Sequence, residues 1–343
     1  MRKDIITLAH GSGGAESASL MSDIFAKHFN NEILERLEDS AVLPLDEGKK
    51  LAVSTDSFVV TPLFFPGGDI GKLAVCGTVN DVLMSGAEPR WLTCGVIIEA
   101  GLSIETLDKA CSSMAFVAAE AGVTIVAGDT KVIEGRGEGG GLMINTTGIG
   151  FIETKDATGT LFYPKPSGIL PGDAILVSGT LGDHHATILS ARLEIKNNIQ
   201  SDCALLAPIV EALRGANISV HAKRDVTRGG LGTVLNELAK ASNVSIEIEE
   251  TKIPVNPEVR AFCGIMGLDP LYMGNEGKMV LAVSPEDADS ALACIRATEI
   301  GKDASLIGYA KPFCNSSFVT KLSRSGGTVR IDVLYGEGLP RIC

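Results

Sequence analysis

Apolar positions recur along the chain with two different periods, and these predict a regular order of helices and strands. A helical period covers residues 15 to about 29, 69–86 and 103–121. Runs typical of strands cover 42–45, 51–56, 89–99, 122–127 and 142–152, the run at 122–127 being continuous enough for a buried strand. The order strand–helix–strand–helix–strand–strand in residues 42–152 predicts an α+β layer on a mixed sheet.

A segment rich in proline and glycine, residues 155–172, separates this first half from the second. Such segments mark domain boundaries, so we predict a first domain over 1–154 and a second, α/β domain over 173–335. The second domain is expected to hold strands at 173–179, 244–249, 278–284, 304–310, 317–322 and 329–333. Helices are expected at 204–215, 233–241 and 285–297, with another starting near His184, and residues 220–232 are interpreted as a loop leading into a helix. Residues 336–343 are expected to form a flexible tail.

Composition narrows the class of protein. A chain of 343 residues is too long for one ordinary core, and 45% hydrophobic with 21% charged residues is typical of a globular protein. The net charge of −12 argues against nucleic acid or an anionic membrane as a partner, because both require a basic surface. Eight cysteines without a C-x-x-C pair, and no uncharged apolar stretch long enough to span a bilayer, indicate a cytoplasmic protein with reduced thiols.

Two features suggest a nucleotide site. The glycine-rich run His10-Gly11-Ser12-Gly13-Gly14 opens a helix and offers backbone N–H groups to an anion. Four carboxylates, Asp39, Asp56, Asp81 and Asp129, end strands or sit in apolar surroundings, and Asn80 and Asp81 interrupt an apolar helix. Each aspartate alone is explained by a cap or a turn. Together, without a nearby cation of their own, they favour a site for Mg²⁺ and a nucleotide.

The end of the chain carries a thiol on a short arm. Gly336 and Gly338 let the backbone swing, Pro340 stiffens the last residues, and the chain ends at Cys343. A thiol on a mobile arm is suited to carrying a group from one site to another. The plain alternative is that Cys343 is simply the last residue.

The motifs also occur in a recognisable order. They are His10-Gly-Ser-Gly-Gly14, Asp39-Ser-Ala41, Thr55-Asp56, Asn80-Asp81-Val82, Gly128-Asp129-Thr130-Lys131, Arg224-Asp-Val-Thr-Arg-Gly-Gly230 and Gly274-Asn-Glu-Gly277. This series resembles the ATP-dependent superfamily of aminoimidazole ribotide synthetase, selenophosphate synthetase and thiamine-monophosphate kinase. The terminal Pro340-Arg-Ile-Cys343 is similar to that of its carbamoyl dehydratases, which act in the maturation of NiFe hydrogenases.

The resemblance implies a fold, an activity and partners. The fold is a two-domain aminoimidazole ribotide synthetase-like one, in which the first domains pair their sheets into a barrel and form a homodimer with ATP near the interface. A carbamoyltransferase loads Cys343, and ATP phosphorylates the amide oxygen of the resulting thiocarbamate. Loss of phosphate and of the nitrogen protons leaves a thiocyanate. Its cyano group then passes to the hydrogenase iron on a scaffold complex.

The same resemblance implies roles for individual residues. His10, Gly11, Gly13 and Gly14 cover the phosphates, while Asp39, Asp56, Asp81 and Asp129 bind Mg²⁺ and the nucleotide with help from Asn80 and Thr130. Glu276 is the candidate base that acts with Cys343, and Lys131 orients the thiocarbamate or a phosphate. Asp225 and Arg228 either contact the nucleotide or the tail, or pair with each other and cap a helix.

Several alternatives stay open from the residues alone. Glu276 is equally explained as a turn carboxylate, and His184-His185 as polar residues at a helix start rather than metal ligands. A selenophosphate synthetase is the nearest enzyme rival, although it is expected to carry a reactive Cys near its N-terminus and no Cys precedes Cys76 here. A non-enzymatic adaptor would instead dock its tail through Leu339 and Ile342.

Overall fold

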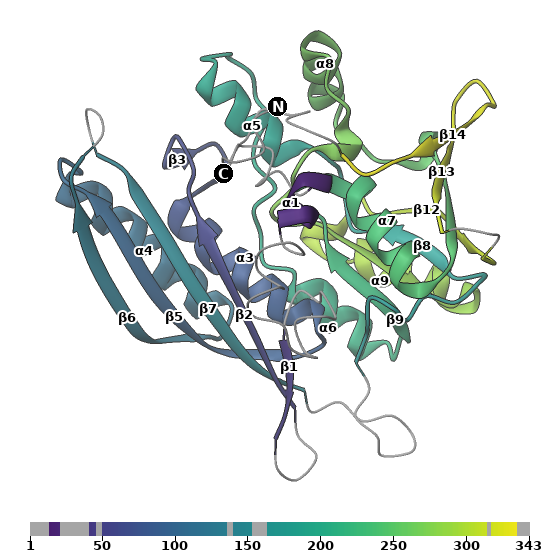
Figure 1. Ribbon diagram of the computed structural model, residues 1–343, viewed down its shortest axis with the longest axis horizontal. Coiled ribbons are helices and arrows are strands. Elements are labelled where there is room, and N and C mark those ends of the chain that lie inside the picture. Colours follow the sequence, from purple (N-terminus) through teal and green to yellow (C-terminus); the bar gives the residue numbers. More distant parts are fainter. Residues whose placement is uncertain are drawn as a thin grey trace.

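The chain folds into two large sheets and one two-stranded sheet, with helices between and around the large ones (Figure 1). The structure, a computed structural model, describes residues 14–20, 41–45, 50–135, 140–152, 163–313 and 317–334. Among these residues, no helix is both long enough and apolar enough to cross a membrane.

The first sheet has five strands in the order β1-β2-β7-β5-β6. Their bounds are β1 Ala41–Pro44, β2 Lys50–Phe58, β7 Leu142–Ile152, β5 Glu88–Glu99 and β6 Thr124–Ile133. All neighbours are antiparallel except β5 and β6, which are parallel and joined by a helix, as a crossover connection requires. A small hairpin, β3 Phe64–Phe65 and β4 Gly68–Asp69, precedes the first long helix.

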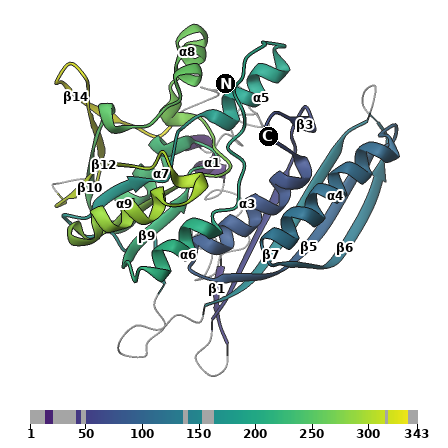
Figure 2. The same cartoon turned by 180° about the vertical axis from the view of Figure 1, so that it is seen from behind.

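Two helices, α3 (Ile70–Met84) and α4 (Ile104–Glu120), cover one face of this sheet (Figure 2). The side chain of Asp69 accepts hydrogen bonds from the N–H groups of Gly71 and Lys72 at the start of α3, and Ser103 caps α4 in the same way. We call the opposite face of the sheet the open face, because no described helix covers it. Only Lys72 and Asp81 of α3 are not buried, which is expected of a helix packed on both sides.

The second sheet has seven strands in the order β14-β13-β10-β12-β8-β11-β9. The bounds are β8 Ala174–Val177, β9 Val220–Asp225, β10 Ser245–Glu249, β11 Met279–Val283, β12 Ser305–Lys311, β13 Val319–Leu322 and β14 Thr328–Ile331. The described helices around it are α5 Asp183–Arg192, α6 Ala207–Gly215, α7 Gly230–Ser242, α8 Pro257–Met266 and α9 Ala288–Arg296. A short helix, α1 Ala15–Leu20, begins with Ala15 donating its N–H to the carbonyl of Leu334 at 3.0 Å.

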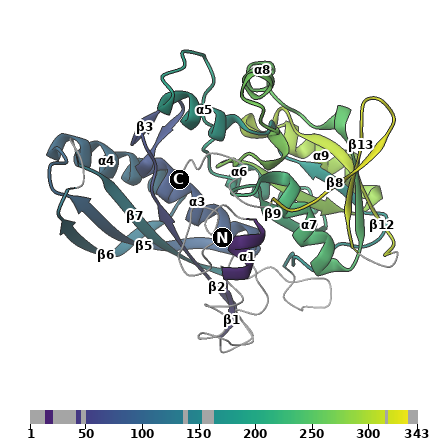
Figure 3. The ribbon, with the colours of Figure 1, turned by 45° about the horizontal axis from the view of Figure 1, so that its top comes forward.

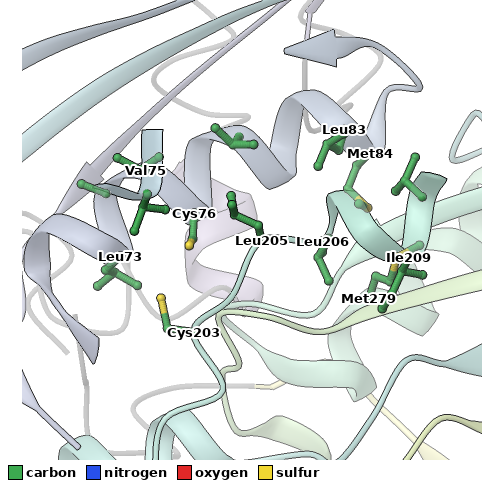
Figure 4. Packing of buried hydrophobic residues seen from close by; sticks show 14 of the residues in the cluster. Leu73, Val75, Cys76, Leu83, Met84, Cys203, Leu205, Leu206, Ile209 and Met279 are labelled. Atoms are coloured by element: carbon green, nitrogen blue, oxygen red, sulfur yellow. The ribbon is translucent and has the colours of Figure 1, made fainter. Parts of the chain in front are cut away.

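One hydrophobic core joins the two sheets. Leu73, Leu83 and Met84 of α3 belong to the same buried cluster as Leu206 and Ile209 (Figure 4). Helix α3 therefore lies between the first sheet and the second domain, as Figure 3 shows from another side. At about 1.5–3 kcal/mol for each fully buried large aliphatic side chain, these contacts hold the domains together strongly.

The sequence predicted most of these elements, with three corrections. Residues 220–225, interpreted as a loop, form strand β9, and α8 was not predicted. The strand predicted at 122–127 to be buried is instead an exposed edge strand, and it continues through Gly128 and Asp129 to Ile133. The part of the predicted helix beyond Leu20 lies outside the described residues, and so does the predicted tail 336–343.

Candidate active site

The carboxylate of Asp56 lies where the first sheet meets the second domain. Asp56 is near the end of β2 and pairs with Thr146 of β7, so the two side chains lie on the same face of the sheet. This face packs against α3, because Thr146 donates a hydrogen bond to the carbonyl of Ala74. Gly77 of α3 is needed at this point, because a Cβ there would stand 2.7 Å from the ring of Phe58 and 3.9 Å from Asp56 Oδ2. The strand and the helix thus approach closely beside the carboxylate.

Arg228 of the second domain reaches the same carboxylate. Its Nη2 atom lies 3.8 Å from Oδ1 of Asp56, and the N–H of Ser57 donates to that oxygen at 2.8 Å. Burial raises the pKa of Asp56, while Arg228 and then the Ser57 N–H oppose that rise. Arg228 therefore has a partner in the other domain, and the idea that the aspartates lack a nearby cation is wrong for Asp56.

Glu276 belongs to the same junction. Its side chain is only 8% exposed and lies on the segment that leads into β11. Burial raises the pKa of Glu276 well above its usual range, and the charges of Asp56, Asp202 and Asp225 raise it further, whereas Arg228 lowers it. A carboxylate in this setting has a high affinity for a proton, which a base that takes a proton from a weak acid requires.

The loops around Glu276 are fixed by Asn275 and by the end of β9. Asn275 is buried, accepts the N–H of Gly182, and donates to the carbonyls of Val226 and Met273. Asp225 is the last residue of β9 and pairs with Met279 of β11. The predicted residues Asp225, Arg228 and Glu276 are therefore brought together with Asp56 by the folding of a single chain.

Asn80 and Asp81 lie on α3 as predicted, but their surroundings differ. Asp81 accepts a hydrogen bond from Ser54 Oγ at 2.7 Å, and Ser54 is two residues before Asp56 on β2. Asn80 is 2% exposed, and its amide donates to the carbonyl of Ala204 and accepts the N–H of Leu206. Both polar atoms of the Asn80 carboxamide thus have partners within the chain, and its nucleotide contact stays a prediction.

Asp129, Thr130 and Lys131 lie elsewhere, on the exposed edge strand β6. Strands β5 and β7 lie between β6 and β2. At about 4.8 Å from one strand to the next, β6, which carries Asp129, is about 14 Å from β2, which carries Asp56. Asp129 pairs with Gly95, which lies opposite Asn145, and Asn145 lies opposite Ser57, so these side chains share the open face. Asp56 lies on the other face, toward α3. Within one chain, the structure does not bring Asp129 together with Asp56 and Asp81.

Other predicted residues fall outside the described ones. His10, Gly11, Gly13, Asp39 and Cys343 are among these, so their roles stay predictions. Gly14 is described, and a Cβ at this position would stand 2.1 Å from the carbonyl oxygen of Leu334.

The described carboxylates fit a magnesium ion only in part. Asp56 and Asp81 present hard oxygen ligands on the β2–α3 side of the junction. Mg²⁺ is usually held by one or two protein carboxylates together with the phosphates of a nucleotide, so this pair would supply the protein's part of such a site and the nucleotide the rest. No group of three or more His, Cys, Asp or Glu side chains among the described residues is arranged for a metal.

His184 and His185 open α5 and are both buried. Burial lowers the pKa of His184 to about 3, so its ring is neutral, and its Nδ1 atom lies 2.7 Å from Ser201 Oγ. These contacts agree with the interpretation as helix-start residues.

Two functional candidates were missed from the sequence. The side chain of Asp202 is only 3% exposed and interacts with Glu276, and Lys278 Nζ lies 3.9 Å from its Oδ2 atom. Neither residue belongs to a recognisable motif: Asp202 lies in a plain polar stretch, and Lys278 directly precedes a strand. Only the fold places them together.

Comparison with known proteins gives the chain a family. Models of the AIR synthase related protein match it in two parts, the N-terminal domain over residues 37–152 and the C-terminal domain over 171–319. Carbamoyl dehydratase HypE of Escherichia coli strain K12 is 46% identical over 98% of this chain and 99% of its own length. Carbamoyl dehydratase HypE of Rhodobacter capsulatus is 43% identical over 100% of this chain and 99% of its own length.

Solved structures agree. The crystal structure of HypE in complex with ATP is 45% identical, covers 99% of this chain and 100% of its own, and has a TM-score of 0.79. HypE in a HypE–HypF complex has a TM-score of 0.84 at 43% identity, covering 92% of this chain and 100% of its own. Since the similarity extends over nearly the whole length of both chains, this chain belongs to the HypE carbamoyl dehydratase family.

Proposed function

We propose that this chain is an ATP-dependent carbamoyl dehydratase that acts on a carbamoyl group carried by its own Cys343. One observation carries the proposal beyond the family match. A buried glutamate, Glu276, with its pKa raised well above the usual range, lies beside Asp56 and Arg228 where the two domains meet. A dehydration that removes protons from an amide nitrogen needs such a group.

The chemistry balances with ATP as the only co-reactant. The amide oxygen of the thiocarbamate attacks the terminal phosphate of ATP, and ADP leaves. The C–O bond then breaks and the oxygen departs with the phosphate, while the two nitrogen protons are lost and a C≡N bond forms. The products are an S-cyano cysteine, ADP, inorganic phosphate and a proton. Phosphorylation is required because an amide oxygen is otherwise a poor leaving group.

We assign the proton transfer to Glu276. Its carboxylate, once ionised, binds a proton strongly, because it is buried and close to Asp56, Asp202 and Asp225. Arg228 lies on the same side and supplies a positive charge next to Asp56, where it would balance charge on the phosphate. Lys131 is proposed to orient the thiocarbamate or a phosphate.

We assign nucleotide and metal binding to the predicted set. Asp56 and Asp81 would hold Mg²⁺ with Asp39, and His10, Gly11, Gly13 and Gly14 would cover the phosphates. When bound, Mg²⁺ would neutralise charge on the phosphates of ATP. The HypE structure with ATP, similar over 99% of this chain, supports ATP as the nucleotide.

A homodimer would complete the site. The open face of the first sheet carries Trp91 and Ile97, each 42% exposed, and Trp91 packs edge-on against Phe151. Large apolar side chains gathered on an uncovered sheet face mark an interaction surface. We propose that two first domains pair these faces, which covers Asp129 and Lys131 of β6 and offers this strand, with Thr130 on its other side, to the nucleotide site of a second copy.

Two further partners follow from the chemistry. Cys343 must be loaded by a carbamoyltransferase, and HypE, a similar protein, is found in a complex with HypF. The cyano group must then be accepted by a hydrogenase iron centre on a scaffold complex.

Intact mass of the C-terminal peptide tests the proposal. The full-length protein is incubated with the carbamoyltransferase, a carbamoyl donor and ATP. We expect a carbamoyl adduct that loses the mass of one water only when ATP is present. Deletion of Cys343 should abolish both adducts, and Cys111→Ser, which changes an exposed thiol on α4, should leave them intact. If the wild-type chain never loses the water, or if the deletion variant still gains a cyano group, the proposal fails.

A further inference from the structure

Residues 201–206, which we call the strap, are the last part of the connection from α5 to α6 and contact both domains. From the first domain, the carbonyl of Pro66 accepts the N–H of Ser201 at 2.9 Å. At its other end, the carboxamide of Asn80 bonds to the backbone of Ala204 and Leu206. The first domain therefore holds the strap at both ends.

The strap also holds the peptide groups of Glu276. Oδ1 of Asp202 accepts the N–H of Glu276 at 3.4 Å, and the N–H of Ala204 donates to the carbonyl of Glu276 at 3.4 Å. Both backbone polar groups of Glu276 are thus bonded to two residues of the strap. The fit is tight, since a Cβ on Gly277 would stand 2.0 Å from the carbonyl oxygen of Asp202.

Asp202 further fixes the start of α5. Gly182, the residue before this helix, has no side chain to cap it, and Oδ1 of Asp202 accepts the N–H of His184 at 3.2 Å instead. The positive end of the α5 dipole and Lys278, 3.9 Å from Oδ2, balance the negative charge.

A buried ion pair adds little to stability, because desolvation offsets most of the attraction between the charges. Burial raises the pKa of Asp202, and Lys278 is the first of the groups that oppose the rise. A hydrophobic pair of similar volume could fill the same space at no loss of stability. What the carboxylate adds is a hydrogen-bond acceptor at one defined point beside Glu276.

We propose that Asp202 is a positioning residue for the dehydration: it fixes the backbone of Glu276 to the strap, and so fixes where the Glu276 carboxyl points. The proposal rests on the proposed function, in which Glu276 takes the amide proton. Asn80 extends the same chain of contacts to α3, so the position of the base is tied to the helix that carries Asp81.

A matched pair of double variants tests this role. Asp202→Asn/Lys278→Met and Asp202→Leu/Lys278→Met both remove the two charges and keep the volumes similar. They differ in one respect, because only Asn retains an oxygen that accepts the N–H groups of Glu276 and His184. Each full-length protein is loaded with the carbamoyl group. Single-turnover conversion to the thiocyanate at saturating ATP, the Kd for ATP and the melting temperature are then measured.

We expect the Leu variant to convert about 10- to 100-fold more slowly than wild type, the range for a misplaced catalytic group, with an unchanged Kd for ATP. The Asn variant should remain within about threefold of wild type, since the acceptor is kept. Asp183→Asn is the control, because Asp183 is a buried carboxylate on α5 that bonds to Thr180 and Asn256 and not to Glu276. It should lower the melting temperature and leave the conversion rate unchanged.

A second change breaks the contact from the other side. Gly277→Ala should push the strap away and slow conversion, whereas Gly264→Ala, where a Cβ meets nothing within 4 Å, should not. This pair decides the question if the Leu variant does not fold.

Equal conversion rates in the Asn and Leu variants would overturn the positioning role. So would slow conversion by Asp183→Asn, or a loss of ATP affinity in the Leu variant that is as large as its loss of rate. If Glu276→Gln converts at full rate, the assignment of the base fails, and the positioning role fails with it. If Glu276→Gln is slow and the Leu variant is not, only the positioning role fails.

Discussion

The candidate residues fall into two regions that differ in how they are built. Asp56, Arg228 and Glu276 lie at the junction of the domains, where burial raises the pKa of both carboxyls and the neighbouring carboxylates raise that of Glu276 further. Asp129 and Lys131 lie on β6, an edge strand whose side chains are in water. The folding of one chain assembles the first region completely. The second region would gain a comparable environment only if another surface covered it, so the proposed roles of the two regions depend on different associations.

The largest expected effect concerns the junction. Glu276→Gln keeps the shape of the side chain but removes its capacity to accept a proton. Carbamoylation of Cys343 should be unchanged, and conversion to the thiocyanate should slow by about 10²- to 10⁴-fold, the contribution of a positioned general base. Mass spectrometry of the C-terminal peptide over time measures both steps. Glu258→Gln on the exposed side of α8 is the control. Conversion by Glu276→Gln at the wild-type rate would remove Glu276 from the mechanism.

Mixing two inactive variants tests whether β6 serves the junction of another copy. Asp129→Asn and Glu276→Gln should each be slow alone. If each site combines Asp129 of one copy with Glu276 of the other, an equal mixture should recover up to about a quarter of wild-type activity, since half the dimers are mixed and have one intact site.

The control introduces Trp91→Glu on the open face into both chains, which should prevent pairing and abolish the recovery. A mixture that stays as slow as its components would show that Asp129 and Glu276 act within the same chain, or that Asp129 does not act.

The smallest effect is on stability. Because the pKa of Glu276 is raised, the folded chain keeps a proton that the unfolded chain has lost, so stability falls as pH rises above the usual Glu range. Glu276→Gln removes this loss. The free energy of unfolding, measured with urea, should therefore rise for the variant relative to wild type between about pH 5 and pH 8, by at most about 1.4 kcal/mol per pH unit.

Asp129→Asn, which also removes one carboxylate but on the exposed strand β6, is the matched comparison. A constant difference between Glu276→Gln and wild type across this range would contradict the raised pKa.

The sequence predicted elements whose apolar pattern is long and regular. Helices α3 and α4 and strands β2, β5 and β7 agree with their predicted ranges to within about two residues at each end, the uncertainty normal for boundaries. Strand β9 was missed because Lys223 and Arg224 give it the look of a loop. The burial of β6 was misjudged for a related reason, since a continuous apolar run does not reveal whether a neighbour covers it.

The site was predictable as a set of residues but not as an arrangement. Motif order pointed to Asp56, Arg228 and Glu276, and the fold brings them together. The partners of Asn80 are backbone groups more than 120 residues away, and Asp202 carries no local signal at all. Contacts between residues so far apart in the chain depend on the packing of the two domains, which no local pattern encodes.

The core shared through α3 has a consequence for how the protein can be divided. Two domains are evident along the sequence, yet α3 is covered by the first sheet on one side and by Leu206 and Ile209 on the other. A chain cut between the sheets would expose this surface on both fragments. The domains should therefore unfold in a single cooperative transition, and neither fragment is suited to serve as an independent module in a fusion protein.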